Sequence, residues 1–183
     1  MDWYSIVKFA HVFAAILWLG GGFTILIMGA LAERSGPDAM LANLKTTNAL
    51  GLLLFMPASL ATLITGLVMA TVWTGFSDLW IIIGMAGAAW TFVTGAFFIK
   101  PVGEKIQALV ETEGMSPAVL EMGRRLTRVA RFDYAVMVVI IADMVMKPGW
   151  GDYAILGAMA AWLILAAVYL NLPRSEHGAP AAA

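Results

Sequence analysis

The chain has 183 residues, of which 61% are hydrophobic and 13% charged, and its mean hydropathy is +0.85. A net charge of −1 gives no general attraction to nucleic acid, so nucleic acid is not an expected partner. The lack of cysteine excludes disulfides, iron–sulfur clusters and thiolate zinc sites. Because the apolar residues are gathered in long blocks, the expected class is an all-α, polytopic bundle in a lipid bilayer.

Five apolar blocks predict five transmembrane helices, at about 3–31, 49–73, 79–99, 127–147 and 153–172. A helix rises ~1.5 Å per residue and needs ~20 residues to cross the hydrocarbon. The fourth block is too short unless its helix begins earlier, and Ser116 followed by Pro117 supplies an N-cap and a first helical residue. Residues 1–174 then form a single membrane bundle, and the tail 175–183 is expected to be disordered.

Two prolines predict irregular helices. Pro57 lies inside the second block and predicts a kink, whose freed carbonyls would find the hydroxyls of Ser59, Thr62 and Thr65. Pro101 is expected to break the third helix, leaving a separate short amphipathic helix over 102–112.

The basic residues predict the orientation. With five spans, nine of the eleven lysines and arginines fall on one side, and only Lys8 and Lys147 on the other. The positive-inside rule then places the N-terminus outside and the C-terminus inside. The belt of aromatic residues expected at the outer ends of the spans agrees with this: Trp3, Tyr4, Trp73, Trp80, Trp150 and Tyr153.

His11 is the first candidate functional residue, because it is a titratable ring at the start of an apolar helix. Polar groups inside bilayers are costly and usually face the interior of the bundle. Three roles are open: a neutral imidazole bonded to a neighbouring helix, a haem or metal ligand, and a proton-handling group.

Two acids lie in the fourth block. Asp143 is expected at a membrane depth similar to that of His11, so it could pair with the ring and orient it. The alternative is an i,i+4 ion pair with Lys147. Asp133 is expected just inside the cytoplasmic interface, in salt bridges with neighbouring arginines.

Twelve methionines raise the question of copper, because thioethers are suitable ligands for Cu(I). Met69, Met85, Met144 and Met146 are expected in the same half of the membrane as His11. Methionine is also an ordinary core residue, and no Met-x-x-Met cluster occurs. The sequence contains no Ser/His/Asp set, P-loop or dinucleotide fingerprint, so no enzymatic activity is predicted.

The segment KFAHVFAAILWLGGGF resembles the first span of the copper-resistance D (CopD)-like membrane proteins, a group that includes the HemJ-type protoporphyrinogen oxidases. The shared residues are Phe9, His11, Trp18, Gly20 and Gly21. The likeness is greatest to an uncharacterised bacterial family of predicted integral membrane proteins, through Pro57…Thr65-Gly66 and Asp133…Met144-Val-Met-Lys-Pro148-Gly149. It implies a location in the bacterial inner membrane.

The HemJ likeness implies haem b at His11. Two features of the HemJ-type proteins are not found in this chain: the proline–arginine pair after the first span, and the lysine within a later span. The second histidine, His177, is expected on the other side of the membrane, so a second axial ligand within the chain would be Met69, Met144 or water. The other hypotheses are a cofactor-free small transporter and a membrane assembly partner. A second copy of the chain or another membrane protein remains open as a partner.

Overall fold

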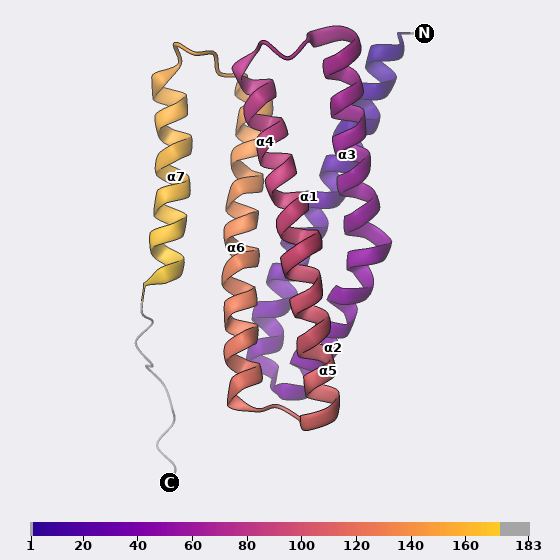
Figure 1. Cartoon of the computed structure of the whole chain (residues 1–183), viewed down its shortest axis with the longest axis vertical. Helices are drawn as coiled ribbons and strands as arrows, with labels where there is room; N and C mark the ends of the chain where they lie inside the picture. The colour runs from indigo at the N-terminus through magenta and orange to yellow at the C-terminus, as the bar shows by residue number, and fades with distance from the viewer. Residues whose placement is uncertain (1, 173–183) are drawn as a thin grey trace.

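The computed structural model describes residues 2–172, and the predicted disordered tail lies outside the described residues. In this part of the chain five long helical stretches run up and down, as Figure 1 shows. The elements in chain order are α1 (Trp3–Ser35), α2 (Pro37–Leu50), η1 (Gly51–Phe55), α3 (Met56–Met69), η2 (Ala70–Thr74), α4 (Leu79–Thr94), η3 (Gly95–Ile99), α5 (Lys100–Glu113), α6 (Pro117–Met146) and α7 (Tyr153–Asn171). The predicted all-α class is confirmed.

The ends of the helices follow local sequence signals. The hydroxyl of Ser116 accepts a hydrogen bond from the backbone N–H of Val119 at 3.3 Å, so the predicted N-cap of α6 is confirmed. The same helix ends before Pro148-Gly149, as predicted, with Lys147 in the left-handed region at φ 48°. The other three turns between long helices contain Gly36, Gly75 and Gly114, each at positive φ.

The segments η1, η2 and η3 are short π-helical stretches, in which the helix is wider than an α-helix. Pro57 is the second residue after η1, so the helix is irregular next to this proline, and the predicted kink itself stays a prediction. The predicted break at Pro101 is wrong, because the helix continues from Leu79 to Glu113. Pro101 follows η3, and the wider turns of η3 accommodate a residue that donates no backbone hydrogen bond.

Four helical stretches are long and apolar enough to cross a membrane: Trp3–Ser35, Asp38–Thr74, Leu79–Glu113 and Tyr153–Asn171. Among the described residues, α6 is the long helix that is missing from this set. Its apolar half carries Arg131, Asp133 and Asp143, which reduce its hydropathy. The chain is therefore a membrane protein with several apolar helices, and the fifth span and the orientation stay predictions.

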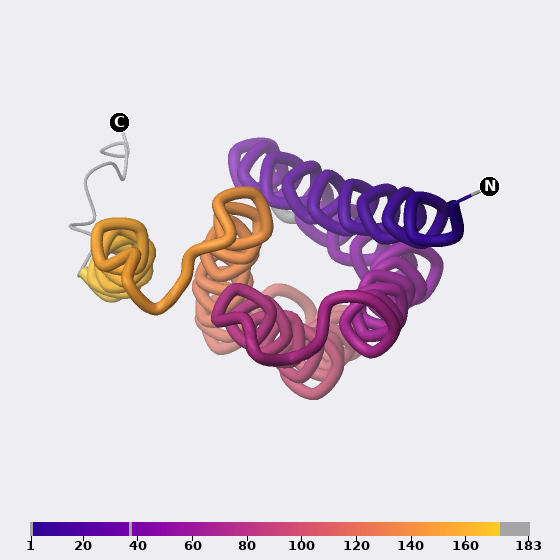
Figure 2. The backbone as a smooth tube through the Cα atoms, turned by 90° about the horizontal axis from the view of Figure 1, so that it is seen from above, coloured from indigo at the N-terminus to yellow at the C-terminus, as the bar shows by residue number. Residues whose placement is uncertain are grey.

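The helices are arranged around an axis, with α7 at the side. Figure 2 shows α1 crossing the bundle obliquely, with its N-terminal end close to α3 and far from α6. The last helix, α7, lies beside α6, where Trp162 Nε1 donates a hydrogen bond to the backbone oxygen of Ala135 at 3.2 Å. The bundle that lines the interior is thus built from α1 to α6.

The end of the bundle opposite the N-terminus is joined by polar contacts between α2 and α5. Lys45 Nζ lies 2.9 Å from Glu111 Oε1, and Asn48 Nδ2 donates to Gln107 Oε1 at 2.7 Å. The hydrogen bond from Lys45 holds the pKa of Glu111 below its usual value. The aromatic residues gather at the other end, where the rings of Tyr4 and Trp73 meet edge to face at 5.5 Å.

Candidate functional site

His11 is held in one tautomer by α3. Its Nδ1 lies 2.9 Å from the backbone oxygen of Thr62 and 3.2 Å from Thr65 Oγ1. A carbonyl oxygen only accepts, so Nδ1 must carry the hydrogen. The Thr65 hydroxyl already donates to the backbone oxygen of Ala61 at 2.6 Å, so it also accepts from Nδ1. Nε2 therefore has a free lone pair, and no hydrogen bond to it is formed by residues 2–172.

Gly66 makes this arrangement sterically feasible. A Cβ atom built on Gly66 would lie 3.1 Å from Cε1 and 3.4 Å from Nδ1 of the His11 ring. Any side chain at position 66 would push the ring away from α3. The carbonyl of Thr62, the hydroxyl of Thr65 and the bare backbone of Gly66 thus form the seat of the ring on one turn of α3.

The His11 ring lines a cavity of about 630 Å³, which is called the His11 cavity below. Ligand sites typically have volumes of ~300–1,000 Å³ and mostly apolar walls. The structure places Met69, Met85 and Met144 on the same walls, together with Trp18, Trp80 and many aliphatic side chains. Met146, in contrast, is 58% exposed and does not line this cavity.

One side of the His11 cavity is formed by residues that face outward. Val12 and Ile16 of α1, and Ile141 and Val145 of α6, line the cavity and are 47, 61, 41 and 75% exposed. These two helices diverge at this end of the bundle, as seen in Figure 2. The cavity is therefore bordered by apolar side chains that face the lipid, between α1 and α6.

Two lysines lie beside aromatic residues of the cavity wall. Lys8 Nζ is 5.8 Å from the centroid of the Tyr4 ring, and Lys147 Nζ is 4.9 Å from the centroid of the Trp80 ring. Tyr4 and Trp80 both line the His11 cavity. The cavity thus has an apolar body and a positively charged rim at the end that carries the N-terminus.

Asp143 makes neither of the two predicted interactions. Both of its carboxylate oxygens are without a hydrogen-bond partner among residues 2–172, although the side chain is 0% exposed. It does not bond to the ring of His11, and Lys147 lies over Trp80 instead of pairing with it. Oδ2 of Asp143 lies 3.4 Å from where a Cβ of Gly84 would be, so the carboxyl packs against α4.

Asp133 differs from its prediction too. The arginines Arg124, Arg125 and Arg128 pair with Glu121, and Asp133 makes no salt bridge with a described residue. Asp133 is only 8% exposed, and its Oδ1 has no hydrogen-bond partner. The prediction failed because α6 turns Asp133 toward the interior, while its arginines lie on the exposed side of the helix.

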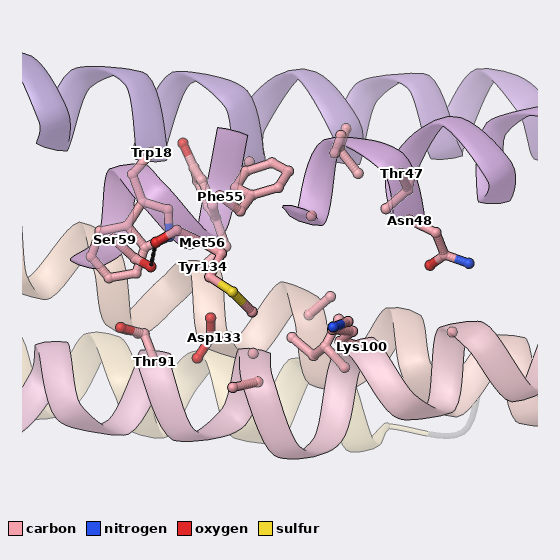
Figure 3. A pocket seen from close by; sticks show the side chains of 18 of the residues that line it. Trp18, Thr47, Asn48, Phe55, Met56, Ser59, Thr91, Lys100, Asp133 and Tyr134 are labelled. Atoms are coloured by element: carbon pink, nitrogen blue, oxygen red, sulfur yellow. Dashed lines mark hydrogen bonds between the residues drawn. The ribbon is translucent and has the colours of Figure 1, made fainter. Parts of the chain in front are cut away.

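Asp133 lines a second cavity, of about 220 Å³, which is called the Asp133 cavity below. Figure 3 shows it from close by, with Ser59, Thr91 and Lys100 on the surrounding helices. Trp18 and Met137 line both cavities and so form the partition between them. The interior of the bundle therefore holds two chambers in series.

A metal site of ordinary protein ligands is not formed by the described part of the chain, since no group of three or more His, Asp or Glu side chains converges there. His11 is the single imidazole in residues 2–172. The sequence did not predict that Thr62, Thr65 and Gly66 form the seat of the His11 ring, or that Ser59 and Thr91 line the same cavity as Asp133. Thr62, Thr65 and Gly66 lie within one helical turn, which is the signal that could have indicated the seat.

These features define an all-α membrane protein with an apolar internal cavity and an oriented histidine on its wall. The chain belongs to the family described as predicted integral membrane protein (DUF2269), whose model matches residues 5–148. The matched residues cover α1 from Ser5 onward and all of α2 to α6, the helices that line both cavities, and end before α7. No curated protein and no solved structure matches the chain.

Proposed function

We propose that this protein binds a flat, apolar cofactor with acidic side groups in the His11 cavity, and that this cofactor is haem b held by Nε2 of His11. The observation that carries the proposal is the orientation of the ring. Histidines that ligate metals commonly donate their other ring N–H to a backbone carbonyl, which fixes the tautomer and raises the basicity of the ligating nitrogen. The bond from Nδ1 to the Thr62 oxygen has this form.

The cavity suits such a ligand in size and in chemistry. Its volume of about 630 Å³ and its apolar walls fit a planar macrocycle. Met69 and Met144 also line the cavity, and either thioether would be a candidate to hold the iron together with His11. Lys8 and Lys147, at the rim, are placed to meet carboxylates of the ligand. The likeness of the first span to the CopD-like group, including its haem-binding members, supports the same assignment.

Haem in this site would supply one-electron redox chemistry. The contribution of the chain is to bind and orient. His11, positioned by α3, would hold the iron, the aliphatic walls would exclude water, and the lysines would attract the acidic groups. The location in a bacterial inner membrane is part of this proposal, on the same resemblance.

A visible absorption spectrum tests the proposal. Full-length protein, purified with haem supplied during expression, is expected to show a Soret band that His11→Ala removes. The reduced protein is expected to bind carbon monoxide readily, because a water or methionine ligand is displaced more easily than a second histidine. Met69→Leu and Met144→Leu report which methionine, if either, is the second ligand. The absence of a Soret band after haem supplementation, or a band that His11→Ala leaves unchanged, contradicts the proposal.

A second candidate function is that of a small transporter. It is favoured by the arrangement of the His11 cavity and the Asp133 cavity, which follow one another along the bundle. Trp18 and Met137 form the wall that separates them. Movement of these two side chains would join the chambers. Substitution of Met137 by alanine is then expected to make liposomes that contain the protein leak small solutes, and tight liposomes would argue against it.

A further inference from the structure

His11 does not line the Asp133 cavity, and the proposed cofactor does not account for this second cavity. Its walls come from α1, from α2 to α3, from α4 to α5, and from α6. The segments η1 and η3 both contribute to it, through Gly51 and Phe55 and through Gly95, Ala96 and Ile99. π-Helical stretches inside α-helices occur frequently at functional sites.

The carboxylate of Asp133 requires a partner that the described residues do not provide. Burying an ionised carboxylate without a partner is very costly, so such groups carry a proton, pair with a cation or coordinate one. Among the groups that line the cavity, Lys100 is the single cation and Tyr134 the single other titratable side chain. Lys100 lies 3.9 Å from Glu104 and makes no ion pair with Asp133.

The neighbouring hydroxyls are oriented as acceptors. Ser59 Oγ donates its hydrogen to the backbone oxygen of Met56 at 3.1 Å, and Thr91 Oγ1 donates to that of Ala88 at 3.1 Å. Each hydroxyl has one hydrogen, so what both oxygens offer to the cavity is lone pairs. Figure 3 shows Ser59, Thr91 and Asp133 on three different helices around the same space. These three acceptor oxygens, one of them on a buried carboxylate that lacks a partner, match a positively charged ligand.

We propose that the Asp133 cavity is a binding site for a small monovalent cation, with Asp133 as the counter-charge and Ser59 and Thr91 as neutral oxygen ligands. A proton carried on Asp133 and an alkali-metal ion both satisfy this chemistry. A cavity of about 220 Å³ has room for several waters, at ~30 Å³ for each, to complete the coordination. The cavity extends to Asn48, Lys100 and Gly103, toward the end of the bundle where α2 and α5 are in contact.

Infrared difference spectroscopy of the full-length protein in lipid nanodiscs tests this site, because protonated and ionised carboxyl groups absorb separately. One arm varies pH between about 5 and 9. In the second arm, Na⁺ or K⁺ replaces choline as the cation of the buffer, at constant ionic strength. A carboxyl signal is expected that Asp133→Asn removes and the matched variant Asp143→Asn retains. A response to Na⁺ or K⁺ assigns an alkali ion, and a response to pH alone assigns the proton.

Variants that lack a hydroxyl test whether Ser59 and Thr91 bind the cation together with Asp133, or whether Asp133 is only an isolated buried acid. Ser59→Ala and Thr91→Val are expected to weaken cation binding about tenfold, or to move the pH midpoint by about one unit. Thr94→Val is the control, because Thr94 is on the same helix as Thr91 and does not line the cavity. If Asp133→Asn does not fold, the hydroxyl variants still test whether the Asp133 cavity binds a cation. The proposal is overturned if neither arm produces a signal that depends on Asp133, or if both hydroxyl variants behave like Thr94→Val.

Discussion

At the scale of single residues, the ring of His11 lies against α3 because position 66 has no side chain. The close approach of 3.1 Å between His11 Cε1 and the Cβ position of Gly66 is what brings Nδ1 within hydrogen-bond distance of the Thr62 oxygen. Gly20 also lines the His11 cavity, but a Cβ at that position would meet nothing within 4 Å. The two glycines therefore allow a matched comparison.

Gly66→Ala is expected to displace the His11 ring by a few tenths of an ångström and to weaken its bond to Thr62. Loss of an outer-shell contact of this kind typically costs 10–100-fold in ligand affinity, so haem affinity is expected to fall by about this factor. Gly20→Ala is expected to leave the affinity unchanged. Nitrogen NMR of the ring gives a second, ligand-independent measurement, in which the wild type should show the Nδ1–H tautomer. Equal affinities for the two variants would contradict an orienting role for the seat.

At the scale of the helices, α4 and α6 pack closely through glycine. A Cβ on Gly87 would lie 2.6 Å from Cγ1 and 2.8 Å from Cδ1 of Ile140. Ile140 is β-branched and stiff at χ1, so it has little freedom to move aside. Small residues at such crossings allow helices to approach in a membrane, where the hydrophobic effect does not drive their association.

Gly87→Ala is therefore expected to destabilise the bundle by about 1–3 kcal/mol, the usual cost of overpacking. Gly157→Ala serves as control, because a Cβ there meets nothing within 4 Å and alanine is the better helix former. That variant is expected to be neutral or stabilising. Thermal unfolding of both proteins in a mild detergent, followed by tryptophan fluorescence, measures the difference. Equal midpoints would show that α4 can move away from α6 without cost.

The helices were more predictable from the sequence than their contacts. Ser116, Pro117 and Pro148 act on their own turns of the helix, so the sequence predicts the two ends of α6 correctly. Pro101 was misread because the effect of a proline depends on the turns before it, and η3 absorbs it. Membrane depth can be counted along the chain, but the rotation of a helix about its axis is determined by packing. This is why Asp133 and Asp143 were given the wrong partners.

At the scale of the whole molecule, the path of the chain bears on the number of spans. The helix α6 begins near the end of α5 and ends near the start of α7, at the opposite end of the bundle, as Figure 1 shows. If α4 and α7 both cross the membrane in the same direction, α6 must cross in the other. This geometry supports the fifth span although α6 carries charged residues.

Reporter fusions test this topology. A reporter after Thr112, in α5, is expected to behave as cytoplasmic, since most basic residues lie at that end. A reporter after Trp150, in the turn between α6 and α7, is expected to behave as external. If both reporters behave alike, α6 does not cross and the five-span arrangement is wrong.

The gap between α1 and α6 affects how affinity must be measured. Because Val12, Ile16, Ile141 and Val145 form the side of the His11 cavity between α1 and α6, we expect a ligand to arrive by diffusion within the bilayer. The concentration that governs occupancy is then moles of ligand per mole of lipid. Adding empty vesicles to a sample at fixed protein and ligand is expected to lower occupancy, whereas adding buffer of equal volume should hardly change it. Occupancy that follows the aqueous volume instead would indicate that the ligand arrives from water, past Lys8 and Lys147.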